Sequence, residues 1–161
     1  MKLIKLTQGQ FAQVDDSDYE WLNQWKWFAT KAKHTFYAYR NTSRKEGKRT
    51  TISMHRLIMD TPKGMDVDHQ DHNGLNCQRF NMRNCTRTQN QANKTPRGSS
   101  KFLGVLVCGG SGRNKGLITA QIQSNHQTVH LGCFKTEEAA AKAYDKAAKL
   151  HHGEFANLNF K

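Results

Sequence analysis

The sequence has few acidic residues and no long apolar run. It contains 13 Asp and Glu against 25 Lys and Arg, which gives a formal net charge of +12. No stretch approaches the ~18 apolar residues that a membrane-spanning helix needs, and no basic amphipathic helix stands out, so a membrane partner is disfavoured. The positive excess favours a polyanionic partner, because phosphate neutralisation supplies most non-specific affinity for nucleic acid. A basic but inert surface is the alternative.

Cysteine pairs of the metal-binding kind are also missing. None of the four cysteines forms a C-x-x-C pair: Cys77, Cys85, Cys108 and Cys133. Cys77 and Cys85 lie near His69 and His72, but their spacing fits no zinc ribbon or finger, so no structural zinc is expected. The first residues, MKLIKLTQGQ, lack the apolar run of ~7–15 residues that a secretion signal carries. We therefore expect a cytoplasmic protein with reduced thiols.

The length of 161 residues suits one mid-sized domain or two small ones. Pro96, Gly98, Ser99 and Ser100 cluster in the stretch KTPRGSSKF, and proline disfavours helix at the residue before it. This composition predicts a linker over 96–101 between a domain of residues 1–95 and a domain of residues 102–161.

The first half is predicted to be rich in strands. Short apolar runs predict strands over 2–6 and 11–14, and Asp15 or Asp16 is placed to cap the short helix that follows. The segments 35–40 and 50–55 are typical of a hairpin, with Lys45, Lys48 and Arg49 as phosphate contacts or solvated charges at its tip. The three tryptophans are best interpreted as core residues.

The second half predicts three strands and one helix. Alternating or apolar runs indicate strands over 104–108, 117–123 and 127–134. A helix is expected to begin after Thr136 and to end near Gly153, with the face of Ala139, Ala143 and Ala147 against a sheet. The fold class is α+β.

The stretch VDHQDHNGLN, residues 67–76, concentrates metal-binding and proton-handling side chains. Asp68 and His69 are expected at the end of a strand, followed by a turn at Asn73-Gly74 and a returning strand over 80–85. Thr86 and Gln89 have the spacing of a capping box, which predicts a helix that breaks at Pro96. Asn90 and Asn93 are spaced i and i+3, so both can face the same side of that helix.

Such side chains suit phosphodiester hydrolysis. Water is a poor nucleophile, and negative charge builds up on the leaving 3′ oxygen. Near neutral pH a histidine can activate the water as a general base, and a hard divalent cation can stabilise the charge on the leaving oxygen. Mg²⁺ keeps several of its waters and needs only one or two protein oxygens, so one Asp and one Asn carbonyl suffice.

The segment resembles the HNH nuclease motif of phage and intron homing endonucleases, in the variant whose last histidine is asparagine. The matching residues are Asp68-His69, Asn73, Asn76, Arg79, Asn81-Met82-Arg83, Thr86 and Asn90-x-x-Asn93. MHRLIM, residues 54–59, resembles the HRL segment of the family. The departures are Asn84 and Cys85, where a bulky apolar pair is common, and His72.

The resemblance implies a ββα-metal core over about 66–95. His69 would be the general base, and Asp68 and Asn90 would hold one Mg²⁺ or Mn²⁺ per site. Asn81 would hold the loop in shape through hydrogen bonds to its backbone.

Several residues near this motif have more than one interpretation. His55 is either a structural histidine or an accessory catalytic residue, and Asn93 is either structural, a phosphate contact or a ligand. Arg79, Arg83 and Arg87 are predicted to bind phosphate near the scissile bond, but ordinary surface charges have the same pattern. A purely structural polar cluster at Asp68-His69 is the remaining alternative.

The second half resembles the ethylene-response-factor (Apetala-type) DNA-binding domain. The matching residues are Gly104-Val105, Ala120-Gln121-Ile122, Leu131-Gly132, Phe134, Glu138-Ala139-Ala140, Ala143-Tyr144-Asp145, Ala147-Ala148, Gly153-Glu154, Ala156 and 157–160. The resemblance implies a three-stranded antiparallel sheet, backed by one helix, that enters the major groove of double-stranded DNA.

Base reading in this domain is expected to differ from that of the plant members. Leu103, Leu106 and Cys108 replace basic positions, and Ile118 replaces a tryptophan. Recognition is then either looser or carried out by the polar residues Arg113, Lys115, Gln121 and Gln123. A protein–protein module is the alternative interpretation of this domain.

Together the two resemblances predict a metal-dependent DNA endonuclease of homing or mobile-element type, either encoded by a phage or resident in a bacterial host. A DNA-binding transcriptional regulator with an inactive nuclease centre is the alternative, followed by a structural nucleoid-type binder. The sequence leaves monomer and homodimer equally open.

Overall fold

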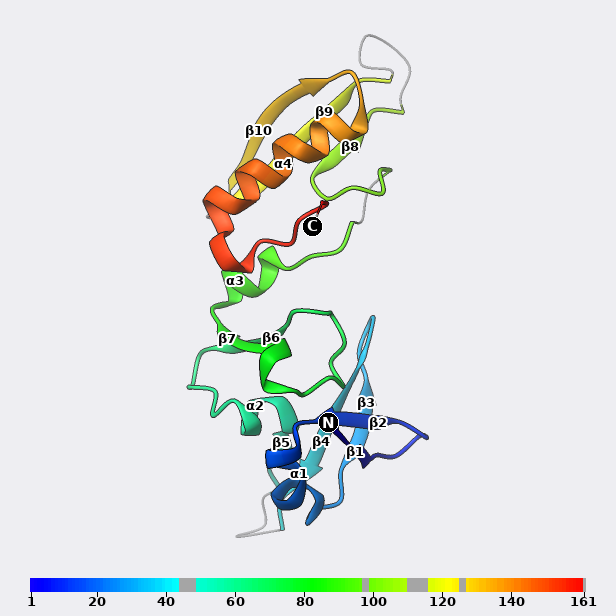
Figure 1. Cartoon of the computed structure of the whole chain (residues 1–161), viewed down its shortest axis with the longest axis vertical. Helices are drawn as coiled ribbons and strands as arrows, with labels where there is room; N and C mark the ends of the chain where they lie inside the picture. The colour runs from blue at the N-terminus through cyan, green and yellow to red at the C-terminus, as the bar shows by residue number, and fades with distance from the viewer. Residues whose placement is uncertain (44–48, 97–98, 110–115, 125–126, 161) are drawn as a thin grey trace. The chain divides into compact units, whose positions relative to one another are not determined.

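The computed structural model describes residues 1–43, 49–96, 99–109, 116–124 and 127–160. These residues divide into two compact units, Met1–Arg87 and Thr88–Lys161. Lys45, Lys48, Arg113 and Lys115 lie outside the described residues, as do positions 97–98 of the predicted linker. Small antiparallel sheets combined with helices confirm the α+β class (Figure 1). In the described part of the chain, no helix is both long and apolar enough to cross a membrane.

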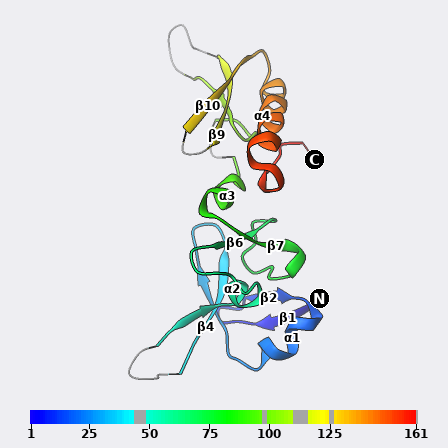
Figure 2. The ribbon, with the colours of Figure 1, turned by 90° about the vertical axis from the view of Figure 1, so that its left-hand side faces the viewer.

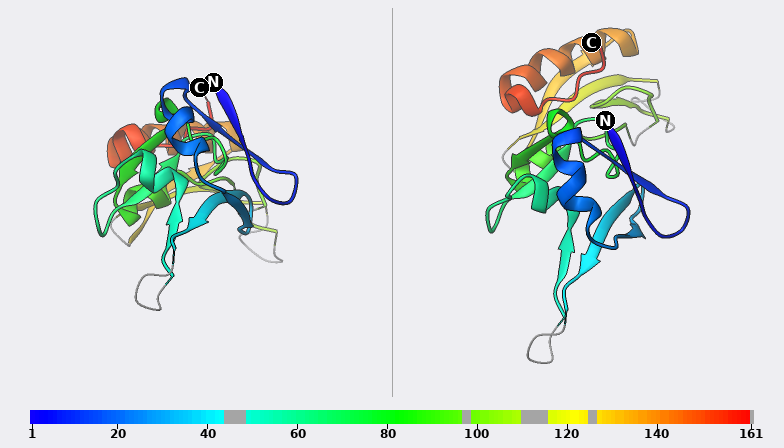
Figure 3. Two further views of the ribbon diagram at one scale, coloured as in Figure 1. Left: turned by 90° about the horizontal axis from the view of Figure 1, so that it is seen from below. Right: turned by 60° about the horizontal axis from the view of Figure 1, so that its bottom comes forward.

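The first unit contains three small sheets and two helices in its described residues. In chain order its elements are β1 (Lys2–Lys5), β2 (Phe11–Val14), α1 (Asp16–Asn23), β3 (Phe28–Lys31), β4 (Phe36–Asn41), β5 (Thr51–Ser53), α2 (Met54–Ile58), β6 (Asp66–His69), the 3₁₀ turn η1 (Arg79–Asn81) and β7 (Met82–Cys85). The sheets pair β1 with β2, β3 with β4 and β5, and β6 with β7, all antiparallel. The hairpin β1–β2 lies beside α1 (Figure 3).

Trp27 belongs to the core of the first unit, as the sequence predicts, and the half-buried Trp21 and Trp25 pack against that core. Trp27 is 4% exposed, and its indole N–H donates to the carbonyl of Leu22, which is fully buried. The ring of Trp25 meets those of Trp21 and Trp27 edge-on, with centroids 6.0 and 6.3 Å apart. Arg40 lies over Trp25, 4.2 Å from the ring centroid. The aromatic surface is therefore used for packing inside the unit.

Two predicted strand boundaries are wrong. The strand expected over 50–55 ends at Ser53, and the next residues form α2. Met54 and Ile58 are both buried and are spaced i and i+4, so a helix buries both where a strand would separate them. Likewise the strand expected from Phe80 begins at Met82, because η1 turns the chain first and leaves Phe80 71% exposed.

The second unit is a three-stranded sheet with one long helix packed on it. Its elements are α3 (Arg87–Ala92, which starts at the junction), β8 (Val105–Val107), β9 (Ile118–Ser124), β10 (Gln127–Phe134), α4 (Glu137–His152) and the 3₁₀ turn η2 (Gly153–Phe155). The strand order is β10-β9-β8, and both pairs are antiparallel. Helix α4 covers one face of this sheet (Figures 1 and 2). The architecture expected for this half is observed.

The buried face of α4 differs from the one predicted. Ala139 is exposed, and the residues that pack on the sheet are Ala140, Ala141, Tyr144 and Ala148. The i+4 spacing of alanines alone misidentified the face, because it ignored Tyr144, the largest apolar side chain of the stripe. The predicted cap is present: the Thr136 hydroxyl accepts a hydrogen bond of 3.2 Å from the amide of Ala139.

The last described residues are tied to the body of the second unit. The buried carboxylate of Asp145 accepts hydrogen bonds from the amides of Asn159 (2.8 Å) and Phe160 (2.9 Å). The side chain of Asn159 in turn accepts a bond from the amide of Leu103 (2.7 Å). The segment after α4 therefore joins the helix to the residues just before β8.

Candidate active site

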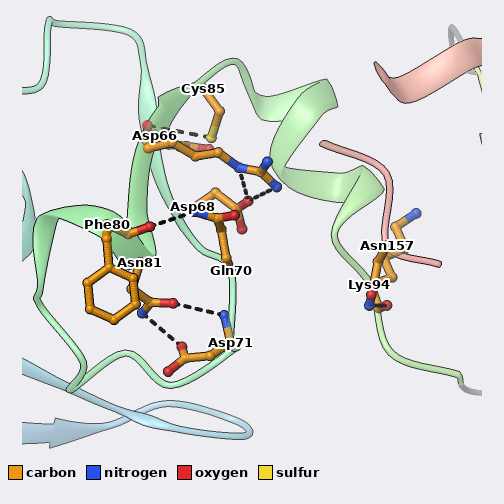
Figure 4. A network of polar contacts seen from close by, with 10 residues as sticks. Asp66, Asp68, Gln70, Asp71, Phe80, Asn81, Cys85, Lys94 and Asn157 are labelled. Carbon is orange, nitrogen blue, oxygen red and sulfur yellow. Dashed lines mark hydrogen bonds and ion pairs between the residues drawn. The ribbon is translucent and has the colours of Figure 1, made fainter. Parts of the chain in front are cut away.

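The pair Asp68-His69 lies at the end of strand β6, where the sequence places it. Both residues are buried, with 3% and 6% of their surfaces exposed. In the antiparallel register with β7, Asp68 stands opposite Arg83 and His69 opposite Met82. The long loop between the two strands begins directly after His69. An acid and an imidazole are thus held on a paired strand next to an irregular loop. Figure 4 shows Asp68 together with the loop residues Gln70 and Asp71.

Asn81 ties this loop together from inside. It is 3% exposed, and its Nδ2 donates to Asp71 Oδ1 and to the carbonyl of Asn76, both at 2.9 Å. Its Oδ1 accepts from the amide of Asp71 at 3.1 Å, and its backbone carbonyl accepts from the amide of Gln70. Every polar atom of the Asn81 amide group is therefore bonded to the loop (Figure 4).

Asp71 also holds the loop together, a role that was not predicted from the sequence. Its carboxylate accepts from the amide of Asn73 at 2.8 Å and from Nδ2 of Asn76 at 2.7 Å. Burial raises the pKa of this carboxyl, but the bonds from Asn76, Asn73 and Asn81 outweigh burial and lower the pKa overall. The amide of Asn73 donates to the carboxylate of Asp71 two residues earlier and so closes an Asx turn, which the order Asp-x-Asn could have indicated.

The predicted Asn73-Gly74 turn is also a packing contact. A Cβ at Gly74 would stand 2.4 Å from the ring of Tyr37, and the Gly74 amide donates to the hydroxyl of Thr35 at 2.9 Å. The φ of Gly74 is not positive, so its backbone conformation does not require glycine. Glycine is required at this position because there is no room for a side chain. The loop can therefore lie directly on β4.

Three rings meet beside this loop: Tyr37, His55 and His69. The centroid of His55 lies 5.3 Å from that of His69, and Tyr37 lies 5.3 Å from His55 and 5.8 Å from His69. Burial, together with the neighbouring His69 and Arg56, lowers the pKa of His55 to about 3. Burial also lowers the pKa of His69, against the opposite effect of Asp71 and Asp68. Both imidazoles are therefore neutral at pH 7, the form in which His69 can accept a proton.

Tyr37 is a site residue that sequence reasoning missed. It comes from β4, 32 positions before His69, and nothing in its local pattern links it to the motif. His55, predicted as an accessory candidate, lies on α2 directly beside His69. Within the described residues, Nδ1 of His55 is buried without a hydrogen-bond partner. The helix carrying the HRL segment therefore forms one wall of the site.

Asp68 is paired with Arg83 across the hairpin. Nε and Nη2 of Arg83 lie 2.8 and 2.7 Å from the same carboxylate oxygen, Oδ2. The side chain of Asp68 is 4% exposed and that of Arg83 is 18% exposed. A buried carboxylate of this kind requires a positive partner, which in this structure is the guanidinium of Arg83.

The donor set suits a hard cation better than a thiophilic one. Asp68 supplies carboxylate oxygen, whereas the thiols of Cys77 and Cys85 donate to backbone carbonyls, and burial raises their pKa values to about 12 and about 11. Among the residues that the structure describes, no three His, Cys, Asp or Glu side chains form a group that could hold a metal. A cation here would depend on amide and water oxygens in addition to Asp68.

Asn90 and Asn93 belong to the second compact unit. Asn90 lies on α3 and Asn93 lies just after it, whereas Asp68 and His69 lie in the first unit. The pairing of Asp68 with Asn90 around one ion stays a prediction, as do the domain bounds at residues 95 and 102.

The other predicted DNA contacts have different surroundings. Arg79 pairs with Asp18 through two bonds of 2.8 Å, while Arg87 is exposed at the start of α3. Gln121 and Gln123 lie on β9, and Gln123 accepts a bond of 3.2 Å from Lys94. The glutamines also line a pocket of about 280 Å³, together with Gln91, Thr95, Thr128, Tyr144 and His152 among others. Their roles in DNA binding stay predictions.

Known proteins similar to this chain fall into two groups. Over 163 residues the chain is 29% identical to a protein of Acanthamoeba polyphaga mimivirus named "Uncharacterized HNH endonuclease L560", and the match covers 98% of this chain and 79% of the viral protein. No family model and no solved structure matches the chain.

The second group consists of plant proteins. The chain is 40% identical over 73 residues to the "AP2/ERF and B3 domain-containing transcription repressor TEM1" of Arabidopsis thaliana, which is 45% of this chain and 18% of that protein. It is 37% identical over 87 residues to "APETALA2-like protein 2" of Oryza sativa subsp. indica, which is 49% of this chain and 19% of the rice protein. The chain therefore spans less than a fifth of these relatives. Similarity to an HNH endonuclease thus extends along nearly the whole chain, and similarity to AP2/ERF proteins along about half of it.

Proposed function

We propose that this protein is a metal-dependent DNA endonuclease of the homing or mobile-element type. The observation that carries the proposal is the pair Asp68-His69, buried at the end of β6 beside a loop that Asn81 and Asp71 hold together. Precise placement of an acid and a base matters more for hydrolysis than for simple binding. The viral relative named as an HNH endonuclease supports the proposal over nearly the full chain.

In this proposal His69 takes the proton of the attacking water as its general base. The rings of Tyr37 and His55 pack against it and fix its orientation, and burial keeps its imidazole neutral. Asp68, with Asn90 from α3, would hold Mg²⁺ or Mn²⁺. When bound, such a cation stabilises the charge that develops on the leaving 3′ oxygen.

The second unit would dock the enzyme on double-stranded DNA. Its resemblance to AP2/ERF proteins supports this role, as does the net charge of +12 on the whole chain. The proposal includes a cytoplasmic location, phage-encoded or within a bacterial host. It is compatible with a monomer that nicks one strand and with a homodimer that cuts both.

Plasmid cleavage tests the proposal directly. Wild-type protein should convert supercoiled DNA to nicked or linear product with Mg²⁺ or Mn²⁺, and EDTA should abolish this conversion. His69→Ala should lose cleavage and keep DNA binding, measured by gel shift in EDTA. His72→Ala is the matched control, because His72 is an exposed histidine of the same loop and should keep cleaving.

Two results would count against the enzyme. One is cleavage by His69→Ala at nearly the wild-type rate, which would remove the general-base assignment. The other is cleavage that persists in EDTA, which would remove the cation from the mechanism. The ratio of nicked to linear product would also separate single-strand from double-strand cutting.

A DNA-binding regulator with an inactive nuclease centre is the second candidate. It is favoured by the ion pair that already occupies Oδ2 of Asp68 and by the plant relative named as a transcription repressor. The same plasmid assay separates the two: a regulator binds DNA with a salt-dependent affinity and gives no product with either cation.

A further inference from the structure

We infer that Arg83 controls how tightly the Asp68 carboxylate binds a divalent cation, because the two compete for the same oxygen. The inference rests on the proposed function. It gives Arg83 a positioning role inside the site, in addition to the phosphate contact predicted from the sequence.

The geometry of the pair supports competition at a single atom. Both Nε and Nη2 of Arg83 point at Oδ2 of Asp68, at 2.8 and 2.7 Å. The register of β6 and β7 places the two residues directly opposite each other, so the contact is built into the hairpin. The Asp68 side chain is only 4% exposed, and this pair helps to fix its orientation. A cation that takes Oδ2 as a ligand must displace the guanidinium or share the oxygen with it.

The positive charge of Arg83 determines the direction in which it changes cation binding at Asp68. An arginine keeps its positive charge at any pH at which the protein is folded, so it repels a divalent cation a few ångströms away. Little water reaches this buried pair, so the repulsion is weakly screened. Even with the dielectric constant of a protein surface, removal of the Arg83 charge is expected to tighten cation binding by about tenfold or more.

A direct binding measurement tests this without any cleavage. Mn²⁺ is titrated into the full-length chain without DNA, and free Mn²⁺ is followed by electron paramagnetic resonance. Arg83→Met keeps much of the side-chain volume and removes the charge, so it should bind Mn²⁺ about tenfold more tightly than wild type. Asp68→Asn should bind weakly or not at all, which places the ion at Asp68.

Arg79→Met is the matched control. Arg79 also makes two bonds of 2.8 Å to a buried carboxylate of the first unit, but that carboxylate is Asp18, outside the site. Loss of either arginine removes a similar ion pair and lowers the melting temperature in EDTA. Only Arg83→Met should show tighter Mn²⁺ binding and a larger rise in melting temperature on addition of Mn²⁺. If Arg83→Met does not fold, Arg83→Gln removes the charge and keeps an amide donor.

Failure of the inference and failure of the proposed function give different results. Wild type that binds Mn²⁺ through Asp68, with equal or weaker binding in Arg83→Met, overturns the inference and leaves the nuclease intact. Binding in Arg83→Met where wild type shows none supports the inference in its strongest form. Absence of Mn²⁺ binding from all variants overturns both.

Discussion

At the scale of single residues, the loop between β6 and β7 depends on two polar side chains, the buried Asn81 and the exposed Asp71. Asn81 bonds to both sides of the loop, and Asp71 collects three donors on one carboxylate. Because Asn81 is buried, its polar atoms are expensive to leave unpaired, and one change at this position breaks several bonds together. The loop is therefore held by a few polar side chains in addition to the burial of Leu75 and Cys77 in the core.

Asn81→Asp should destabilise the first unit by about 2–4 kcal/mol, because the new carboxylate replaces a donor and faces Asp71. Urea unfolding at pH 7 measures this loss, and cleavage should fall with it. Asn73→Asp is the control, since Asn73 is exposed and uses only its Oδ1 as an acceptor for the amide of Leu75. Equal stability losses in the two variants would contradict the role given to Asn81.

His55 should make stability depend on pH in a defined window. Its pKa in the folded protein is about 3, below the ordinary 6.5, so between these values the unfolded chain binds more protons than the folded one. Stability should thus be unaffected by this group above pH 6.5 and fall as the pH drops below it, by about 2 kcal/mol between pH 7 and pH 5. His55→Phe keeps a neutral ring against Tyr37 and His69 and should flatten this dependence.

Urea unfolding of both proteins at pH 7 and pH 5 measures the difference. A His55→Phe variant that loses as much stability as wild type on acidification would show that other groups carry the pH dependence.

Sequence reasoning identified part of the candidate site at this scale, and its catalytic assignments stay predictions. It located Asp68 and His69, because their order and spacing carry a motif. It missed Tyr37, because the contact between β4 and the loop after β6 is set by tertiary packing. The Asp68–Arg83 pair was missed for a different reason: it depends on the register of two strands, and a shift by one residue would have sent Arg83 to the other face.

At the scale of elements, the packing of the second unit depends on the close approach of helix α4 to its sheet. Gly104 lies just before β8 with φ +70°, and a Cβ there would stand 2.0 Å from the Tyr144 ring. Alanines on α4 and Ala120 on β9 keep the remaining contact surface small. Helix and sheet can therefore pack closely only if position 104 has no side chain.

Gly104→Ala should destabilise the second unit by about 2–4 kcal/mol, since it combines a positive φ with a clash against an aromatic ring. Thermal unfolding followed by circular dichroism measures the change. Gly109→Ala serves as the control, because an added Cβ at Gly109 meets no atom within 4 Å and its φ is ordinary. A tolerated Gly104→Ala would mean that α4 can move away from the sheet without loss.

Most elements could be predicted from local pattern, and the errors have a common cause. The strand over 127–134 is observed with the bounds expected from alternation and apolarity. At α2 and on α4, a local pattern was compatible with two structures, and burial of Met54, Ile58 and Tyr144 decided between them. That decision depends on what lies opposite in the fold, which a single sequence does not contain.

At the scale of the whole molecule, the chain divides into two compact units. The separation falls between Arg87 and Thr88, so nearly all of α3 belongs with the sheet and α4. A bond from Asn157 to the carbonyl of Lys94 ties the segment after α3 to the end of the chain. The linker at 96–101, which was predicted from composition, stays a prediction.

Deletion of residues 98–161 should weaken DNA binding and flatten its dependence on salt. These residues carry 8 Lys and Arg against 4 Asp and Glu, and each phosphate contact they lose reduces the slope of log K against log salt by about 0.9. Fluorescence anisotropy with a labelled duplex, at several salt concentrations in EDTA, gives both quantities. The circular dichroism of the shortened chain must first show a folded first unit. An unchanged slope would contradict the docking role of the second unit.

The bonds from Asn159 and Phe160 to Asp145 have a consequence for synthesis. Segments emerge from the ribosome in chain order, and an early domain generally folds first. The first unit, with Asp68 and His69, can reach its native state while the second is still being made. The second unit cannot close until residue 160 has appeared, because the bonds that join α4 to the residues before β8 run through this late segment. A nascent chain would therefore hold Asp68 and His69 in their native places before the second unit, which carries Asn90 and the sheet proposed to bind DNA, has folded.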